Sequence, residues 1–98
     1  MTRESILSDG FGIYIDTVFQ GPVPVVSDGN GFAIIYRTEL AAHREIASHA
    51  IVQLEEFLRN EREFEDAIIV EEYIVPVTVC GNGRMADSMG NTFRAAME

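Results

Sequence analysis

Residues 38–60, with the sequence TELAAHREIASHAIVQLEEFLRN, decide the fold because they form the longest segment with one clear periodicity. Thr38 is a favourable N-cap, and Glu39 lies in the first turn, where the helix dipole favours an anion. At about 100° per residue, apolar side chains fill one arc of about 140°. That arc contains Ile46, Phe57, Ala50, His43, Leu54, Ala47, Leu58, Leu40 and Ile51. The pattern predicts a helix that ends near Arg59 or Asn60 and packs this arc on a sheet.

Residues 11–37, which precede this helix, have the alternation and the turn residues of strands. Residues 11–19 form one predicted strand, which Gly21-Pro22 ends. Residues 23–27 and 32–37 flank Asp28-Gly29-Asn30-Gly31, where Gly and Asn tolerate positive φ. These two segments are therefore predicted to pair as a hairpin, and the second is predicted to be central because it is apolar on both faces.

Residues 67–70 and 73–80, which follow the helix, read as extended segments. Gly81-Asn82-Gly83 has the same turn chemistry as the earlier loop, so residues 84–87 are predicted to return as the second strand of a hairpin. Pro76 lies inside the apolar run and has no N–H to donate. Its position indicates an edge strand or a bulge.

These segments together predict an α+β fold, an antiparallel sheet of four to five strands with one amphipathic helix packed on one face. The 98 residues are enough for a single domain, expected over residues 1–98. Residues 1–8 and 90–98 are expected to be loosely ordered, as chain ends commonly are.

The charge balance excludes several classes of partner. Sixteen acidic and seven basic residues give a formal net charge of −9, and the pI is near 4.5. Direct binding to nucleic acid needs clustered cations, and so does binding to an anionic membrane, so neither partner is expected. No apolar run reaches the roughly 18 residues that a membrane span requires. Cys80 is the only cysteine, which rules out an internal disulfide and favours a reducing, cytoplasmic compartment.

His43, His49 and Cys80 are the first residues to consider for catalysis. The two histidines lie about 120° apart on the helix, so a shared metal or a proton relay between them is not expected. Glu45 and His49 are four residues apart and could bind a metal together, but no third ligand is apparent. We interpret His43 as a side chain at the rim of the core, His49 as a solvated neighbour of Glu45, and Cys80 as a buried, inert thiol.

The glycine-rich turns do not predict a cofactor site. No G-x-G-x-x-G or Walker pattern follows a strand and opens a helix, so a phosphate-binding loop is not expected. Asp28-Gly29-Asn30 begins like a calcium loop, but a Phe occupies the third ligand position and no Glu closes the loop. No cofactor and no metal are therefore predicted.

An acidic cluster follows the end of the helix and is the candidate partner-binding site. It consists of Glu55, Glu56, Glu61, Glu63, Glu65, Asp66, Glu71 and Glu72, with only Arg59 and Arg62 among them. One interpretation is a solvated helix end that keeps the protein soluble by repulsion. The other is a focused negative patch that steers the domain onto a basic surface of a protein or a protein–nucleic-acid complex.

The chain resembles the short acidic accessory proteins of phages and mobile elements, including anti-CRISPR proteins. The similarity lies in its size and acidic balance, in the strand–helix passage at residues 36–40, and in residues 71–79, EEYIVPVTV, which lead into a Gly-Asn-Gly turn. This resemblance implies a non-enzymatic inhibitor in the cytoplasm of a bacterial host. Its carboxylates would occupy a nucleic-acid-binding or recruitment surface of a defence complex such as a CRISPR effector.

Two alternatives remain at this point. The chain is also similar to HicB-like antitoxins, which place a helix after three strands, although their Pro-Gly-Cys signature at the strand–helix passage is absent here. A self-associating regulatory module, a homodimer joined through an edge strand at Pro76, is the other binding hypothesis. A small enzyme that uses Glu45, His49 or Cys80 ranks last, because a general base needs a partner that the sequence does not supply.

Overall fold

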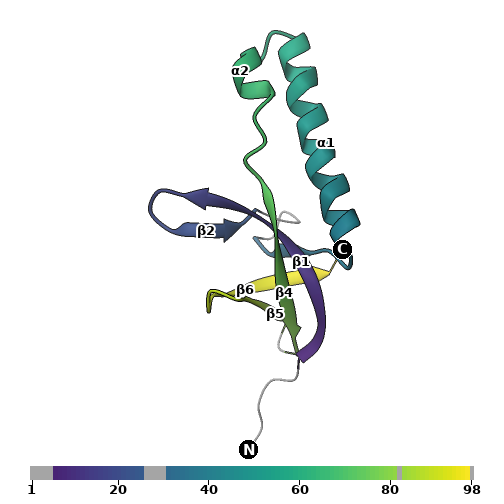
Figure 1. The fold of residues 1–98 in the computed structure, drawn as a ribbon, viewed down its shortest axis with the longest axis vertical. Coiled ribbons are helices and arrows are strands. Elements are labelled where there is room, and N and C mark those ends of the chain that lie inside the picture. The colour runs from purple at the N-terminus through teal and green to yellow at the C-terminus, as the bar shows by residue number, and fades with distance from the viewer. Residues whose placement is uncertain (1–5, 26–30, 82, 98) are drawn as a thin grey trace, which may run out of the picture.

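The computed structural model describes residues 6–25, 31–81 and 83–97, which form six strands and two helices (Figure 1). In chain order these are β1 (Ile6–Thr17), β2 (Gly21–Pro24), β3 (Ala33–Ile35), α1 (Glu39–Leu58), α2 (Phe64–Ala67), β4 (Tyr73–Cys80), β5 (Arg84–Asp87) and β6 (Thr92–Met97). The predicted α+β class with one main helix is confirmed, and the sheet has six strands rather than four or five.

The sheet curls until its two ends nearly meet. The strand order is β2-β1-β4-β5-β6-β3, and every pair is antiparallel except β3 with β6. Just after β3, the N–H of Tyr36 donates to the carbonyl of Phe11 in β1, and the N–H of Phe11 donates to the carbonyl of Tyr36, both at 2.8 Å. This bridge joins β3 to the outer edge of β1, so the sheet is nearly a barrel.

The core fills the inside of this curled sheet. Tyr14, Ile35 and Met85 are its largest fully buried side chains. The Tyr14 hydroxyl donates to Oδ2 of the buried Asp87 at 2.9 Å, and Oδ1 of Asp87 accepts the N–H groups of Met89 and Asn91 at 2.9 and 3.0 Å. Burial, and then the hydrogen bond and charge of Asp87, raise the pKa of Tyr14 well above its usual range, so its hydroxyl stays protonated as the donor.

Both ends of the predicted main helix are confirmed. The side chain of Thr38 accepts a hydrogen bond from the N–H of Ala41 at 3.0 Å, so it caps α1 as the sequence predicts. At the other end, Asn60 has a φ of 64°. The N–H groups of Asn60 and Glu61 donate to the carbonyls of Phe57 and Glu56 at 3.0 and 2.8 Å. This is a Schellman cap, which Asn can supply because it tolerates the left-handed conformation.

The second predicted hairpin is confirmed and the first is wrong. β4 and β5 pair antiparallel, as the sequence predicts. The first hairpin was expected between residues 23–27 and 32–37, but β2 pairs with β1, and β3 pairs in parallel with β6. The expected turn at residues 28–30, with its rejected calcium loop, lies outside the described residues. Turn residues indicate where the chain can reverse direction, but they do not indicate which strands pair with each other.

Residues 6–8, expected in a loosely ordered N-terminal segment, begin β1 and pair with the end of β4. Two segments after α1 also differ from their predictions. Residues 67–70 were expected to be extended, but Phe64–Ala67 form α2 and residues 68–72 form an irregular connector to β4. Residues 92–97, expected in a loosely ordered tail, form β6 and lie between β5 and β3 in the sheet. The short apolar runs in both segments have no periodicity that separates helix from strand.

Pro76 lies in an interior strand, so its assignment to an edge strand is wrong. It is opposite Phe11, whose N–H and C=O are both used on Tyr36, so this pair needs no N–H from β4. The nitrogen of Pro76 therefore faces the β5 side, beyond the last pair of that ladder, Val77 with Asp87. A proline fits an interior strand here because no carbonyl group of a neighbouring strand requires an N–H donor at this position.

Candidate functional site: the helical arm

Two helices and a connector project from the sheet as an arm (Figure 1). We call residues 39–72 the helical arm; it comprises α1, the turn at residues 59–63, α2 and the connector at residues 68–72. Only the first turns of α1 pack on the sheet, where Ala42 is fully buried and Ile46 packs against the cluster of Ile13 and Tyr36. The prediction that the helix lies across one face of the sheet therefore holds for its beginning alone. Farther along, α1 packs on α2. The rings of Phe57 and Phe64 meet edge to face, with their centroids 5.3 Å apart.

Polar residues of α1 face the rest of the chain, and many of its apolar residues face solvent. The buried or half-buried positions include Ala42, Glu45, His49 and Gln53, which come largely from the polar side of the predicted wheel. Leu40, Ile51, Leu54 and Leu58 of the predicted apolar arc are exposed by 58%, 56%, 41% and 77%. His43, expected at the rim of the core, is also exposed. The predicted arc is divided. Ile46, Ala50 and Phe57 along one edge of it are half-buried, with Ile46 packed on the sheet, and its other residues are exposed. The prediction that the whole arc faces the sheet is therefore wrong.

An open cleft of about 630 Å³ separates α1 from the connector. Its lining combines apolar side chains with His49, Gln53 and several carboxylates. The side-chain amide of Gln53 spans the cleft and donates to the carbonyl of Ile69 at 3.1 Å and to that of Ala67 at 3.5 Å. Gln53 thus holds the end of α2 and the connector against α1 and satisfies one carbonyl group of each.

Lower in the same cleft, His49 lies between two carboxylates. Its Nδ1 is 2.8 Å from both oxygens of Glu72, and its Nε2 is 2.9 Å from Oε2 of Glu45. The pair with Glu45 follows from their four-residue spacing and agrees with the sequence prediction. Glu72 comes from the end of the connector, 23 residues away, and no local signal in the sequence could have placed it beside His49.

The three groups form an ion cluster. Burial favours the neutral ring and lowers the pKa of His49, but the hydrogen bonds and charges of Glu72, then of Glu45, outweigh it and raise that pKa above its usual value. A ring with a carboxylate at each nitrogen is satisfied only when both nitrogens are protonated, so it has no free base. Cys80, expected to be buried, is half-buried and lies at the opposite end of β4 from Glu72.

The described residues contain neither a cluster of metal-ligating side chains nor a helix that could span a membrane. Within residues 6–25, 31–81 and 83–97, no group of three or more His, Cys, Asp and Glu side chains is arranged to hold a metal ion. Neither helix in this part of the chain has both the length and the apolar content needed to cross a bilayer.

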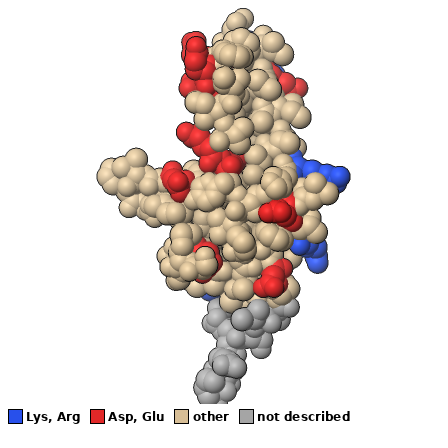
Figure 2. All heavy atoms as spheres, in the orientation of Figure 1, with Lys and Arg blue, Asp and Glu red and all other residues tan. Residues whose placement is uncertain are grey.

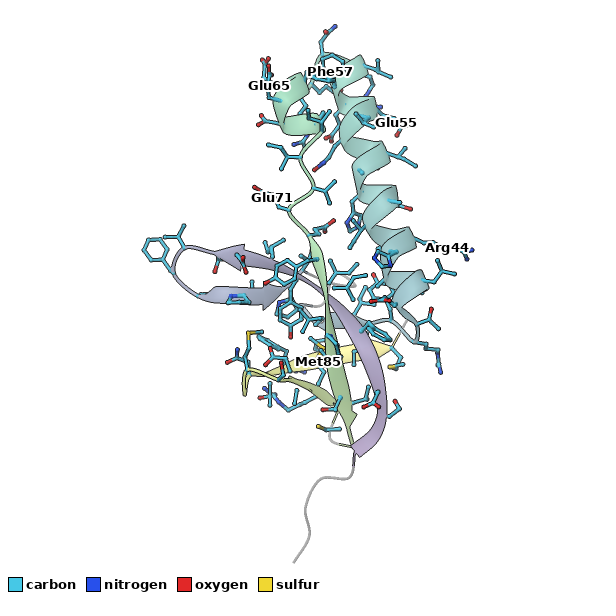
Figure 3. The ribbon with its side chains drawn as sticks, in the orientation of Figure 1. Arg44, Glu55, Phe57, Glu65, Glu71 and Met85 are labelled. Atoms are coloured by element: carbon cyan, nitrogen blue, oxygen red, sulfur yellow. The ribbon has the colours of Figure 1, made fainter. Side chains whose placement is uncertain are left out.

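The eight acidic residues predicted as a partner-binding site all lie on the arm, but they do not form one patch. Three of them are paired. Oε1 of Glu56 is 2.8 Å from Nη2 of Arg62, Oε1 of Glu61 is 3.1 Å from Nη2 of Arg59, and Glu72 binds His49. Glu55 projects from the side of α1 that faces away from α2 (Figure 3). The expected single cluster is therefore divided between two sides of the arm and partly neutralised.

Four acidic residues remain together on one side. Glu63, Glu65, Asp66 and Glu71, which we call the acidic edge, follow α2 and the connector and are exposed. None of the four forms an ion pair with any residue in the described part of the chain. Figure 2 shows acidic side chains along this side of the arm, while the basic side chains in view lie across from it.

Comparison with protein-family models, with curated proteins and with solved structures found no match for this chain.

Proposed function

We propose that this chain is a non-enzymatic binding protein, and that its acidic edge docks on a basic, nucleic-acid-binding surface of another protein. The observation that carries this proposal is the set of four exposed carboxylates on α2 and the connector, without an ion pair among the described residues. A cytoplasmic inhibitor of a bacterial defence complex, such as an anti-CRISPR-type protein acting on a CRISPR effector, would use such a surface.

The position of the edge favours recognition over simple solubility. An arm that projects from the sheet can enter a groove that the rounded sheet cannot (Figure 1). Carboxylates spaced along such an arm act as a row of negative charges, comparable in sign to the phosphates that a basic groove normally holds. Charges within about 8 to 10 Å of one another add to a common field at physiological salt. Complementarity of this kind mainly raises the association rate and selects among partners.

The hydrogen bonds of His49 and Gln53 in the cleft give a second argument for a binding role. The imidazole ring of His49 has a carboxylate at each nitrogen, and its contact with Glu72 holds the connector against α1. Gln53 does the same a turn higher. The cleft is therefore built to keep the acidic edge in place, and these residues position the edge rather than react.

The test is capture from a bacterial lysate by immobilised protein, with a charge-matched pair of variants. E65K/E71K reverses two charges of the acidic edge, and D9K/E39K reverses two exposed charges elsewhere. We expect the unmodified chain and D9K/E39K to retain nucleic-acid-binding proteins, and E65K/E71K to lose them. Added duplex DNA should compete for the captured proteins, and raised salt should release them. Equal capture by both variants, or capture that DNA does not reduce, would contradict the proposal.

A further inference from the structure

The outward side of α1 carries a regular apolar stripe that the proposed function does not use. Leu40, Arg44, Ala47, Ile51, Leu54 and Leu58, which we call the outer stripe, follow one another at intervals of four, three, four, three and four residues. The five intervals average 3.6 residues, close to the 3.5-residue a/d repeat of helices that pack along one another, and Arg44 is the one charged residue of the stripe. All six residues are exposed.

The outer stripe has no partner in its own chain. Ala42 is the only residue of α1 that is buried. The side of the helix turned toward the sheet, the connector and α2 is opposite the stripe and carries His49 and Gln53, which hold the connector. A helix whose outer side met only water would be expected to place polar residues there. Here the sequence does the reverse, which indicates that another helix covers the stripe.

The stripe is complementary to itself when two copies run antiparallel about a twofold axis placed between Ala47 and Ile51. Leu40 then lies opposite Leu58 of the second copy, and the small Ala47 lies opposite the large Ile51. Large against small lets the two helices approach closely at the centre. Each contact occurs twice, as a twofold interface requires.

Two charges, Arg44 within the stripe and Glu55 beside it, favour the same arrangement. Arg44 lies opposite Leu54 of the second copy, and Glu55 is the residue after Leu54. Arg44 and Glu55 both project on the side of α1 away from α2 (Figure 3). Neither side chain forms an ion pair within the described residues. Eleven residues separate them, so they do not meet on one helix, but the antiparallel arrangement places Arg44 next to Glu55 of the second copy. A parallel pair would instead bring the acidic ends of the two arms together, which repel.

We propose that the outer stripe of α1 is a homodimer interface, in which the helices of two copies pack antiparallel about a twofold axis. This inference concerns a different side of the arm from the acidic edge and does not depend on the proposed function. In such a dimer both acidic edges stay exposed and point away from each other. A dimer would therefore present two docking edges, and a partner with two basic sites would bind with increased avidity.

Sedimentation equilibrium of the full chain at low micromolar to millimolar concentration tests the interface. The wild type is expected to be a dimer and I51E a monomer, because the substitution puts a charge at the centre of the contact. V52E is the matched control. Val52 is the next residue, is 49% exposed and lies off the stripe, so V52E should remain dimeric. A monomeric wild type, or a dimeric I51E, would overturn the proposal. Far-UV circular dichroism establishes that each variant retains its helix.

A charge exchange tests the orientation. R44E and E55R should each weaken the dimer by roughly tenfold or more, because each brings two pairs of like charges together. The double variant R44E/E55R should recover most of the lost affinity. Failure of the double variant to recover would show that these residues do not meet, and would overturn the antiparallel arrangement. E65K/E71K should dimerise like the wild type, which separates this test from that of the acidic edge.

Discussion

The Nδ1 atom of His49 on α1 lies 2.8 Å from both carboxylate oxygens of Glu72, the last residue before β4. This contact joins the arm to the sheet at the point where the irregular connector ends. Because Glu45 occupies the other nitrogen at 2.9 Å, the ring bridges two segments of chain through its charged form. The stability of the arm should therefore depend on the protonation of one side chain.

The stability of the wild type is expected to fall as the pH rises above neutrality. The carboxylates of Glu72 and Glu45 raise the folded-state pKa of His49 above its unfolded value of about 6.5, against the effect of burial. The stabilisation is fully present below about pH 6.5 and is lost as the pH rises through the folded pKa. Its size is limited, since the side chain is 40% exposed and solvent screens the pair.

Urea unfolding of the wild type at about pH 5.5 and about pH 8.5 measures this dependence. H49Q should flatten it. H43Q is the control, because it removes the exposed histidine of the same helix and should leave the dependence unchanged. If H49Q retained the wild-type pH dependence, the contact between His49 and Glu72 would have no energetic role.

Tyr14→Phe should destabilise the fold by about 1 to 3 kcal/mol, because it removes one of the donors to a buried carboxylate. Asp87 is 8% exposed, and the Tyr14 hydroxyl is its only donor at Oδ2 among the described residues. Tyr73→Phe is the matched control. It also removes a hydroxyl bonded to an aspartate, Asp16, at 2.5 Å, but that carboxylate is exposed and water can replace the donor. Equal losses in urea unfolding would contradict this account.

Gly10→Val should prevent the sheet from closing. A Cβ atom at position 10 would lie 2.5 Å from Cγ2 of Ile35 and 3.2 Å from the carbonyl oxygen of Tyr36, at the bridge between β1 and the end of β3. The clash should cost about 1 to 3 kcal/mol or more, because a branched side chain and a backbone atom would both have to move. Ser8→Val, at an exposed position on the same strand, should change the unfolding midpoint little. A stable Gly10→Val variant would mean that the bridge is not closely packed.

Features that depend on neighbouring residues were predictable from the sequence. Thr38 and the polar end near Asn60 define α1, because capping needs only groups within one turn. The hairpin of β4 and β5 follows from its Gly-Asn-Gly turn. The acidic residues between Glu55 and Glu72 are equally a property of the chain order, and all of them lie on the arm.

Features that depend on distant segments were decided by the tertiary structure alone. β3 pairs with β6, at the other end of the chain, and Pro76 is tolerated in an interior strand because Phe11 bonds to Tyr36 instead. Neither relation leaves a local pattern, since strand pairing is selected by total packing. The same holds for α1. Its periodicity identifies an apolar arc, but only the packing of Ala42 and the contact of His49 with Glu72 decide that most of this arc points outward.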